Sequence, residues 1–143
     1  MIDTDLQDVL TNKAIMNNQE ERNLLGNGGK YVVEPRSEKE IAEVLRYANT
    51  HKKKVNVISG GTKRGYGGLR ENADILLSLA NYKGIVEHSV GDLTMTVKPG
   101  TTMKEISEQL GQHGQRIPLD AAWPERATIG GVVSANDSGP KRL

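Results

Sequence analysis

The stretch that decides the fold is YVVEPRSEKEIAEVLRYANTHKKKVNVISGG, from Tyr31 to Gly61. Two short apolar runs, 31–33 and 55–58, have the composition of β-strands. Between them, apolar side chains recur at helical spacing, at Ile41, Val44, Leu45 and Ala48. Ser37 followed by Glu40 is typical of a capping box, which predicts where this helix begins. The order strand, helix, strand predicts a right-handed βαβ unit with parallel strands.

Composition restricts the functional classes. The 143 residues, 36% hydrophobic and 26% charged, indicate a soluble globular protein with one core. A formal net charge of +1 gives no overall field that would attract nucleic acid or an anionic membrane, so any anion site has to be local. The absence of cysteine excludes disulfides, cysteine-ligated metals and a cysteine nucleophile. No apolar run is long enough to span a membrane, so we expect a cytoplasmic protein.

The sequence around the βαβ unit predicts further elements. Residues 3–25 have the apolar spacing of a helix, and the glycines at 26–29 end it. Residues 75–79 form a continuous apolar run, which predicts a third, buried strand. Residues 85–90 and 94–98 predict a hairpin that turns at Gly91 and Asp92, where glycine would supply a positive φ.

The last third of the chain contains one more clear element. Thr102 with Glu105 repeats the capping-box pattern and predicts a helix that ends near Gly111 to Gly114. From Arg116 onward the periodicity is lost, so we expect that segment to be disordered or to be ordered by something it binds. Together the elements predict an α+β fold. A small parallel βαβ sheet flanked by helices is followed by the start of a second, antiparallel α+β subdomain.

The first candidate site is the loop SGGTKRGYGG, residues 59–68, which follows the second strand of the βαβ unit. Ligands of α/β folds bind where parallel strands end, and glycines allow several backbone N–H groups to converge on one anion. Ser59 and Thr62 would add hydroxyl groups, and Lys63 or Arg64 positive charge. The spacing matches neither a dinucleotide-binding motif nor a Walker loop. The loop alone leaves a phosphate cradle and a flexible glycine turn equally open.

The second candidate site is ATIGGVVSAN, residues 127–136. Its two adjacent glycines and small side chains would let a backbone approach a flat ring or a pyrophosphate closely. Thr128, Ser134 and Asn136 surround the glycines with neutral hydrogen-bonding groups. Taken alone, the stretch favours the alternative of a buried small-residue turn that packs against a strand.

Together, these stretches and the intervening Pro118-Leu119-Asp120 resemble the flavin-binding domain of the vanillyl-alcohol oxidase and p-cresol methylhydroxylase superfamily. The resemblance is greatest to the FAD-binding subunit of glycolate oxidase and extends from about Lys30 to the last residue. It implies that FAD is the cofactor and that the first loop takes the pyrophosphate. The cofactor-binding residues that it implies are Ser59, Gly60, Gly61, Thr62, Lys63, Arg64, Gly65, Pro118, Asp120, Thr128, Ile129, Gly130, Gly131, Ser134 and Asn136.

Two departures from the family pattern carry predictions. Members that attach FAD covalently through this loop have a histidine after the two glycines, where this chain has Thr62, so the resemblance implies a non-covalent flavin. Asp137 follows Asn136 where many relatives have alanine, and a carboxylate near a pyrophosphate is unfavourable unless it points away.

The resemblance also implies a function and a domain organisation. We expect residues 1–143 to form a single FAD-binding domain that is incomplete at its C-terminus. Its expected parts are a helical segment at 1–29, a βαβ-β subdomain at 30–80 and the start of a second subdomain from 81 onward. The whole protein would be an oxidoreductase acting on a 2-hydroxy acid such as glycolate or D-lactate. No residue is predicted to be catalytic, because substrate-binding groups would come from the remainder of the oxidoreductase or from other subunits.

Two other functional classes remain open from the residues. The run from His51 to Lys54, together with the basic loop and Tyr66, permits a small RNA-binding module. The near-neutral net charge and the shortage of aromatic residues count against it. The other alternative is a non-catalytic subunit that retains the flavin-binding fold without flavin. The three histidines lack the spacing of metal ligands, so we predict no metal site.

Overall fold

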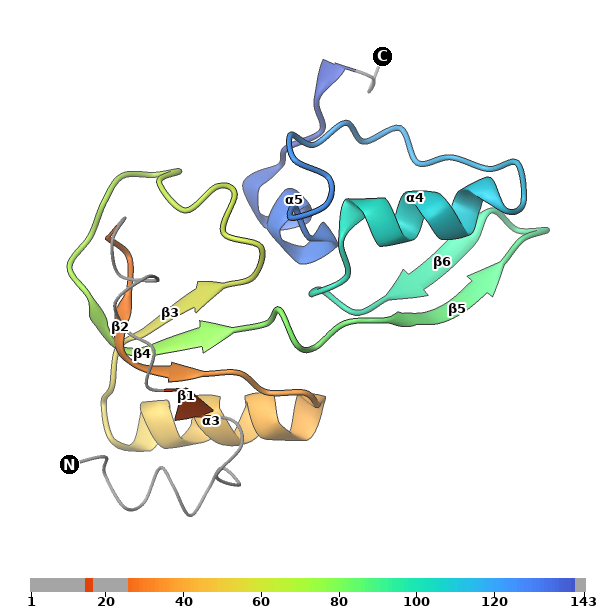
Figure 1. Ribbon diagram of the computed structural model, residues 1–143. Helices are drawn as coiled ribbons and strands as arrows, with labels where there is room; N and C mark the ends of the chain where they lie inside the picture. The colour runs from red at the N-terminus through yellow and green to blue at the C-terminus, as the bar shows by residue number, and fades with distance from the viewer. Residues whose placement is uncertain (1–14, 17–25, 141–143) are drawn as a thin grey trace. The chain divides into compact units, whose positions relative to one another are not determined.

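A computed structural model of the chain describes residues 15–16 and 26–140 (Figure 1). The chain divides into two compact units. Unit 1 comprises Met1–Ile58 and Arg64–Asn81, and unit 2 comprises Ser59–Lys63 and Tyr82–Leu143. The glycine-rich loop therefore contributes its first five residues to unit 2 and the others to unit 1.

Unit 1 is built on a four-stranded sheet in the order β1-β2-β4-β3. Its parallel strands are β2 (Gly29–Val33), β4 (Ala73–Ser78) and β3 (Val55–Ile58). The parallel βαβ arrangement is as predicted, but β2 and β3 are not neighbours, because β4 pairs with both of them. Being central and covered, β4 is buried at five of its six positions, which explains its continuous apolar sequence.

Helix α3 (Glu38–Thr50) lies along one face of this sheet (Figure 1). The side chains that form the core between them are Val33, Val44, Tyr47, Ala48, Ile75 and Leu77. The hydroxyl of Ser37 accepts a hydrogen bond from the backbone N–H of Glu40 at 3.3 Å, as an N-cap should. The prediction is wrong for the second hydrogen bond of the capping box, from the Ser37 backbone N–H to the Glu40 carboxylate. The Glu40 carboxylate accepts from the backbone N–H of Arg36, at 2.6 Å, one residue earlier than the cap.

The helix predicted over residues 3–25 lies largely outside the described residues. Within it, Ile15–Met16 forms β1, which pairs antiparallel with β2, so the prediction is wrong at these two positions. Strand β2 would otherwise be an edge of the sheet with open backbone N–H and C=O groups, and pairing with β1 satisfies some of them.

The first strands of unit 2 are β5 (Ile85–Ser89) and β6 (Thr94–Val97), which form an antiparallel hairpin. The turn lies where it was predicted, but the positive φ is at Leu93 (φ +56°) and not at Gly91. The Ser89 hydroxyl donates to the Asp92 carboxylate at 2.6 Å and holds the turn. The sequence pattern contains no signal for a left-handed leucine at this position.

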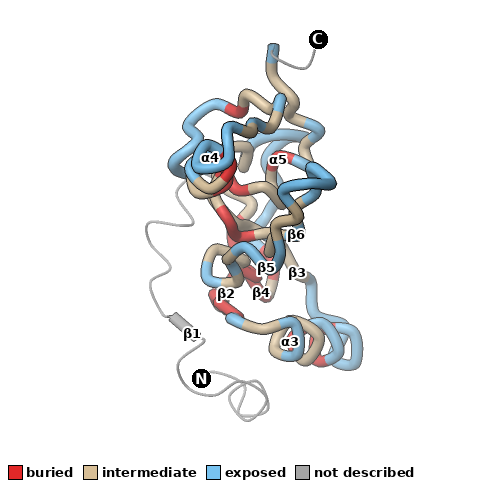
Figure 2. The backbone as a smooth tube through the Cα atoms, turned by 90° about the vertical axis from the view of Figure 1, so that its right-hand side faces the viewer, coloured by how far each residue is buried: buried red, intermediate tan, exposed pale blue. Residues whose placement is uncertain are grey.

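Two helices complete unit 2, α4 (Met103–Gly111) and α5 (Ile129–Ala135). Each has both buried and exposed positions (Figure 2). Their buried side chains share one core with the segment between them, made of Met103, Ile106, Leu110, Ala121, Ala127 and Val132. The predicted irregularity after Arg116 is therefore wrong for residues 129–135. A seven-residue helix that contains two glycines has too short and too weak an apolar period to be recognised.

The units confirm the predicted α+β class, with a small parallel sheet followed by an antiparallel pair of strands. Across the part of the chain that the structure describes, no helix is both long and apolar enough to cross a membrane.

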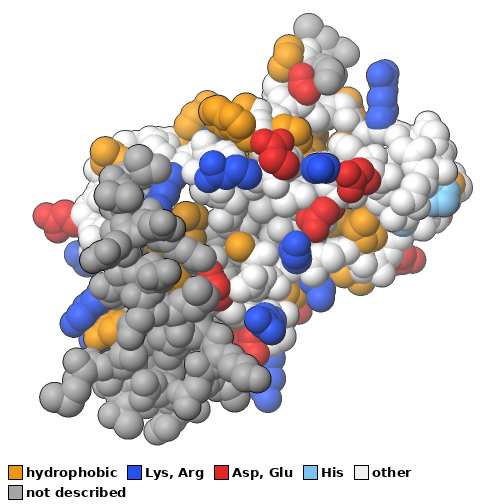
Figure 3. Space-filling view, in the orientation of Figure 1, with side chains coloured by type: hydrophobic (Ala, Val, Ile, Leu, Met, Phe, Trp, Pro, Cys, Tyr) orange, Lys and Arg blue, Asp and Glu red, His pale blue; other side chains and the backbone are white. Residues whose placement is uncertain are grey.

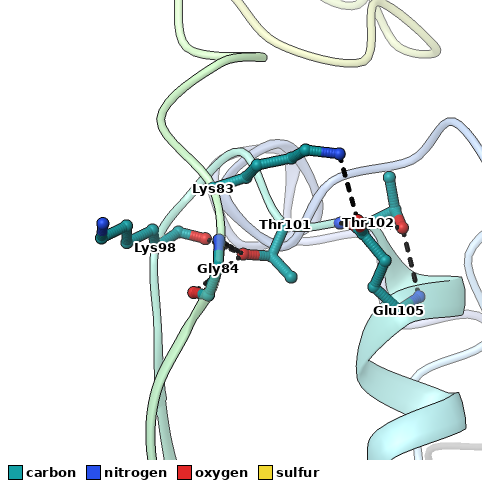
Figure 4. A network of polar contacts seen from close by, with 6 residues as sticks. All are labelled: Lys83, Gly84, Lys98, Thr101, Thr102 and Glu105. Atoms are coloured by element: carbon teal, nitrogen blue, oxygen red, sulfur yellow. Dashed lines mark hydrogen bonds and ion pairs between the residues drawn. The ribbon is translucent and has the colours of Figure 1, made fainter. Parts of the chain in front are cut away.

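The connection between the hairpin and α4 is held by a polar network (Figure 4). The buried Thr101 hydroxyl donates to the carbonyl oxygen of Lys98 at 2.7 Å and accepts from the backbone N–H of Gly84 at 3.0 Å. Thr102 then starts α4 with a complete capping box, as predicted. Its hydroxyl accepts from the N–H of Glu105 at 3.1 Å, and its own N–H donates to the Glu105 carboxylate at 2.8 Å.

The capping box makes the stability of unit 2 depend on acid pH. The hydrogen bond from the Thr102 backbone N–H, with smaller contributions from the Thr102 hydroxyl and Lys83, holds the pKa of Glu105 below its usual range, although partial burial opposes them. A lowered pKa in the folded state stabilises the fold above the unfolded-state pKa, about 4.3 for glutamate. That contribution is lost as the pH falls through the lower folded-state pKa.

We expect Glu105→Gln to lower the free energy of unfolding by roughly 0.5 kcal/mol at pH 7, because the side chain is partly exposed. The difference from the parent at pH 7 should become smaller at an acidic pH well below the unfolded-state pKa of about 4.3, because the glutamate is then progressively protonated. Urea unfolding at both pH values measures this. Glu108→Gln is the control, because Glu108 contacts Lys104 only at 3.8 Å on the surface. A difference that is the same at both pH values would contradict the expectation.

Candidate functional site

The loop after β3 requires its first two glycines for different reasons. Gly60 lies against the backbone of Arg126, and a Cβ at this position would overlap the Arg126 carbonyl oxygen. It would also come within 3.4 Å of the Thr128 Cγ2 atom. Gly61 has φ +70°, in the left-handed region that glycine adopts without strain. The start of the predicted glycine loop is thus packed against the segment that precedes α5.

The loop presents hydrogen-bond donors that the protein does not use. In the parts of the chain that the structure describes, the backbone N–H groups of Gly60, Gly61 and Thr62 donate to no other residue. The Ser59 hydroxyl oxygen is buried and also lacks a hydrogen-bond partner among those residues. Because buried polar groups are almost always paired, the unpaired Ser59 hydroxyl marks a place where a ligand or water binds. The three N–H groups belong to half-exposed residues and are open to a ligand or to water. The donor set, three amides and one hydroxyl, suits a phosphate group.

The second glycine stretch has the opposite character, because its donors are already used. The N–H of Ile129 donates to the Thr101 carbonyl at 2.9 Å, and that of Gly130 to the Pro99 carbonyl at 3.0 Å. The N–H of Gly131 donates to the Thr128 hydroxyl at 3.4 Å. A Cβ at Gly130 would lie 2.7 Å from the Pro99 Cβ. These glycines therefore let α5 pack on the turn before α4. The cofactor contacts predicted for residues 128–131 stay a prediction, and these three N–H groups are not available for them.

The predicted residues on either side of α5 are brought close together. The backbone N–H of Asp120 donates to the Ser138 carbonyl at 3.1 Å. Gly139 lies so close to Asp120 that a Cβ on it would overlap the Asp120 carbonyl oxygen. Asn136 ends α5 in the left-handed conformation, with φ +51°, and this reversal directs the chain back toward Asp120.

Three further predicted residues lie at the edges of this arrangement. Ser134 and Asn136 are at least partly exposed on and just after α5. Pro118 lines, together with Ile129, an open hollow of about 500 Å³ whose other walls include Met95, Ile106 and Leu110. The contribution of these residues to cofactor binding stays a prediction.

An ion pair links the loop to the end of α5, and the sequence analysis did not predict it. The Lys63 ammonium lies 2.8 Å from the Asp137 carboxylate, and the two side chains are 23% and 17% exposed. Asp137 was expected to disfavour a pyrophosphate unless it pointed away. In the structure its charge is instead opposed by the first cation of the loop.

The second half of the loop belongs to unit 1 and is held there by a residue that the sequence analysis missed. The side-chain amide of Asn27 donates to the carbonyl oxygens of Arg64, at 2.7 Å, and Gly68, at 3.1 Å. Its oxygen accepts from the N–H of Arg70 at 2.8 Å. Gly65 closes a turn by accepting from the Gly68 N–H. The available signal in the sequence was a single asparagine within a run of glycines, a residue type that is common in turns. In the structure this asparagine is left-handed, with φ +52°.

The described charged residues on the face drawn in Figure 3 do not form a continuous basic patch. Figure 3 shows basic and acidic side chains interspersed over the face that it draws. Two acidic residues of α4 are paired, Glu105 with Lys83 and Glu108 with Lys104. His88 and His113 are in ring contact, with centroids 5.1 Å apart, and His88 also bonds to Gln115. Across residues 15–16 and 26–140, no three acidic or histidine side chains are grouped to hold a metal ion.

These observations define an α+β fold whose glycine-rich loop directly follows the parallel strand β3 and has three backbone N–H groups without an acceptor among the described residues. The chain belongs to the FAD binding domain family, whose model matches residues 29–143. Membership confirms the predicted family and identifies FAD as its cofactor.

Relatives of known function cover most of this chain, but the chain corresponds to only a small part of each. The mitochondrial D-lactate dehydrogenase (cytochrome) of Arabidopsis thaliana is 30% identical over 108 residues, which is 76% of this chain and 19% of that protein. Glycolate oxidase subunit GlcD of Bacillus subtilis is 26% identical over 112 residues, 78% of this chain and 24% of that subunit. The chain therefore spans about a fifth to a quarter of the length of these relatives.

Solved structures confirm the predicted p-cresol methylhydroxylase type of fold. The crystal structure of p-cresol methylhydroxylase with substrate bound superposes with a TM-score of 0.73 at 16% identity, covering 91% of this chain and 28% of that one. Alkyldihydroxyacetonephosphate synthase gives a TM-score of 0.77 at 14% identity, covering 92% and 28%. At such identities the likeness establishes the fold alone.

Proposed function

We propose that this chain holds FAD non-covalently as the cofactor-binding part of a flavin-dependent oxidoreductase that oxidises a 2-hydroxy acid of the glycolate or D-lactate type. The observation that carries the proposal is the loop 59–62, whose three amides and buried hydroxyl have no partner among the described residues. The substrate class rests on the names of the relatives, which include D-lactate dehydrogenase, D-2-hydroxyglutarate dehydrogenase and a glycolate oxidase subunit.

The residues of the loop would divide the work of binding. The N–H groups of Gly60, Gly61 and Thr62 would donate to pyrophosphate oxygens, and Ser59 would add its hydroxyl. Each hydrogen bond to a charged oxygen contributes roughly 1.5–3 kcal/mol, so three or four would hold the group. Thr62 has no nucleophilic nitrogen with which to tether the flavin, which supports a non-covalent complex. When bound, FAD supplies the redox chemistry of its isoalloxazine ring.

The proposal assigns no catalytic residue to this chain. Residues 1–143 would form part of a single FAD-binding domain. The groups that bind the hydroxy acid and accept its proton would lie in the remainder of the oxidoreductase or in other subunits. The short match to the relatives supports this assignment of roles. This chain corresponds to only 19% and 24% of the length of two relatives named for such oxidations.

Uptake of FAD by the purified chain, followed by flavin fluorescence and by the visible absorption of the bound flavin, tests the proposal. Gly61→Asp should weaken binding by at least about a hundredfold, because it places a carboxylate beside the phosphate and strains a left-handed residue. Gly114→Asp adds the same charge at a similar φ of +67°, in open space, and should bind FAD like the parent.

Denaturing the complex should release all of the flavin, as expected without a covalent bond. Flavin that remains on the denatured chain would contradict the role given to Thr62. A chain that takes up no FAD but binds short RNA in a salt-dependent way would overturn the proposal in favour of an RNA-binding module. If neither this chain nor a version extended past Leu143 binds FAD or RNA, the non-catalytic subunit would be indicated.

A further inference from the structure

We propose that Asp137 is an internal counter-ion of the phosphate-binding loop. Its carboxylate pairs with the Lys63 ammonium until a phosphate of the cofactor takes its place. The proposal rests on the proposed function, because it concerns the same loop. Its basis is the 2.8 Å ion pair between these side chains, both of which are largely shielded from solvent.

Lys63 is placed to act on an anion bound by the loop. It directly follows Gly60, Gly61 and Thr62, whose N–H groups have no acceptor in the described residues. A phosphate held by those amides would therefore lie next to the backbone of Lys63. Lys63 is the first cation after these donors in the sequence, and in the structure Asp137 neutralises its charge.

Asp137 is held in place by its own backbone. Its N–H donates to the Val132 carbonyl at 3.0 Å, and Asn136, which precedes it, has the left-handed conformation that ends α5. A carboxylate at the carboxyl end of a helix is disfavoured by the helix dipole. The position of Asp137 is thus not explained by the stability of α5. The contact in the structure that compensates its charge is the one with Lys63.

The pair has two electrostatic consequences for an anion at the loop. While it is closed, Lys63 contributes little net positive potential, because the adjacent carboxylate cancels it. When a phosphate binds, the carboxylate is a like charge nearby and opposes it. Both effects lower the affinity of the loop for a phosphate. They also make that affinity less dependent on salt concentration than it would be without Asp137. A cofactor held in this way exchanges more readily, consistent with the absence of a covalent tether.

The test compares Asp137→Asn, Lys63→Gln and the double variant in the full chain, with FAD and inorganic pyrophosphate as separate probes. Asp137→Asn should bind both probes about tenfold more tightly at low salt, because the opposing carboxylate is gone, and the gain should shrink as salt screens the charge of Lys63. Lys63→Gln should weaken binding by about tenfold, because it leaves Asp137 uncompensated near the phosphate. In the Lys63→Gln background, removing Asp137 should restore affinity to within about threefold of the parent.

Asp92→Asn is the matched control, because it removes one negative charge from the hairpin turn of the same unit. It should leave both affinities unchanged. Equal gains from Asp92→Asn and Asp137→Asn would show a general charge effect and overturn the proposal. So would parent-like or weaker binding by a folded Asp137→Asn. Should that variant not fold, parent-like binding by Lys63→Gln would overturn it in the same way.

The two proposals fail differently. If the parent takes up FAD and Asp137→Asn has the same affinity, the counter-ion role alone is wrong. If neither the parent nor Asp137→Asn binds FAD or pyrophosphate, the proposed function fails and the counter-ion role fails with it.

Discussion

Replacing Gly60 with alanine is expected to weaken FAD binding by at least about a hundredfold, because the loop has no space for a methyl group. The new Cβ would overlap the carbonyl oxygen of Arg126, a backbone atom that cannot swing aside as the end of a side chain can. The loop would have to shift, and the N–H groups of Gly61 and Thr62 would shift with it. Two misdirected charge-assisted hydrogen bonds cost roughly 3 kcal/mol, which corresponds to about a hundredfold in affinity.

Flavin fluorescence titration measures this loss, and urea unfolding shows whether the variant remains folded. Gly91→Ala is the matched control. Gly91, like Gly60, does not have a positive φ. In contrast to Gly60, a Cβ added at Gly91 would meet no atom within 4 Å. Gly91→Ala should keep the parent affinity. A folded Gly60→Ala variant that binds FAD as the parent does would remove this loop from the cofactor site.

Much of the fold could be predicted because burial has a local period. The spacing of Ile41, Val44 and Ala48 reports the face that α3 turns to the sheet, and the apolar run at 75–79 reports a strand covered on both sides. The strand order could not be predicted in the same way. The position of β4 between β2 and β3 depends on pairing between distant segments, which leaves no period in the sequence.

The candidate site shows a similar division. Glycines after a parallel strand predicted a loop with open amides, and the structure contains those amides at Gly60, Gly61 and Thr62. The same argument applied to Gly130 and Gly131 misses that their N–H groups have internal acceptors. The acceptors of Ile129 and Gly130 belong to the turn before α4, far away in sequence. A glycine pair alone does not reveal whether it admits a ligand or a neighbouring helix turn.

The ion pair of Lys63 and Asp137 was beyond prediction for the same reason, since its members are brought together only by the packing of α5. The sequence could show that Asp137 is an unusual neighbour for a phosphate. It could not show which cation opposes the charge, because the loop offers both Lys63 and Arg64. The structure resolves this choice in favour of Lys63.

Gly139→Ala is expected to lower the free energy of unfolding of unit 2 by roughly 3 kcal/mol or more, a larger loss than that expected for Glu105→Gln. Gly139 has φ +66°, which alone costs an alanine about 1 kcal/mol. In addition, its Cβ would overlap the Asp120 carbonyl oxygen and lie 2.9 Å from the Asp120 Cβ. Relieving these contacts should break the hydrogen bond between the Asp120 N–H and the Ser138 carbonyl.

Gly114→Ala separates the two causes, because Gly114 has nearly the same φ, +67°, and a Cβ there would meet no atom within 4 Å. Gly114→Ala should lower the free energy of unfolding only by the cost of a left-handed alanine, about 1 kcal/mol. Urea unfolding with linear extrapolation measures this loss. The excess loss in Gly139→Ala then measures how firmly the segment after α5 is held against Asp120. Because Asp137 lies in that segment, the variant should also disturb its pairing with Lys63 and change FAD affinity. Equal losses in the two variants would mean that the approach to Asp120 contributes nothing to stability.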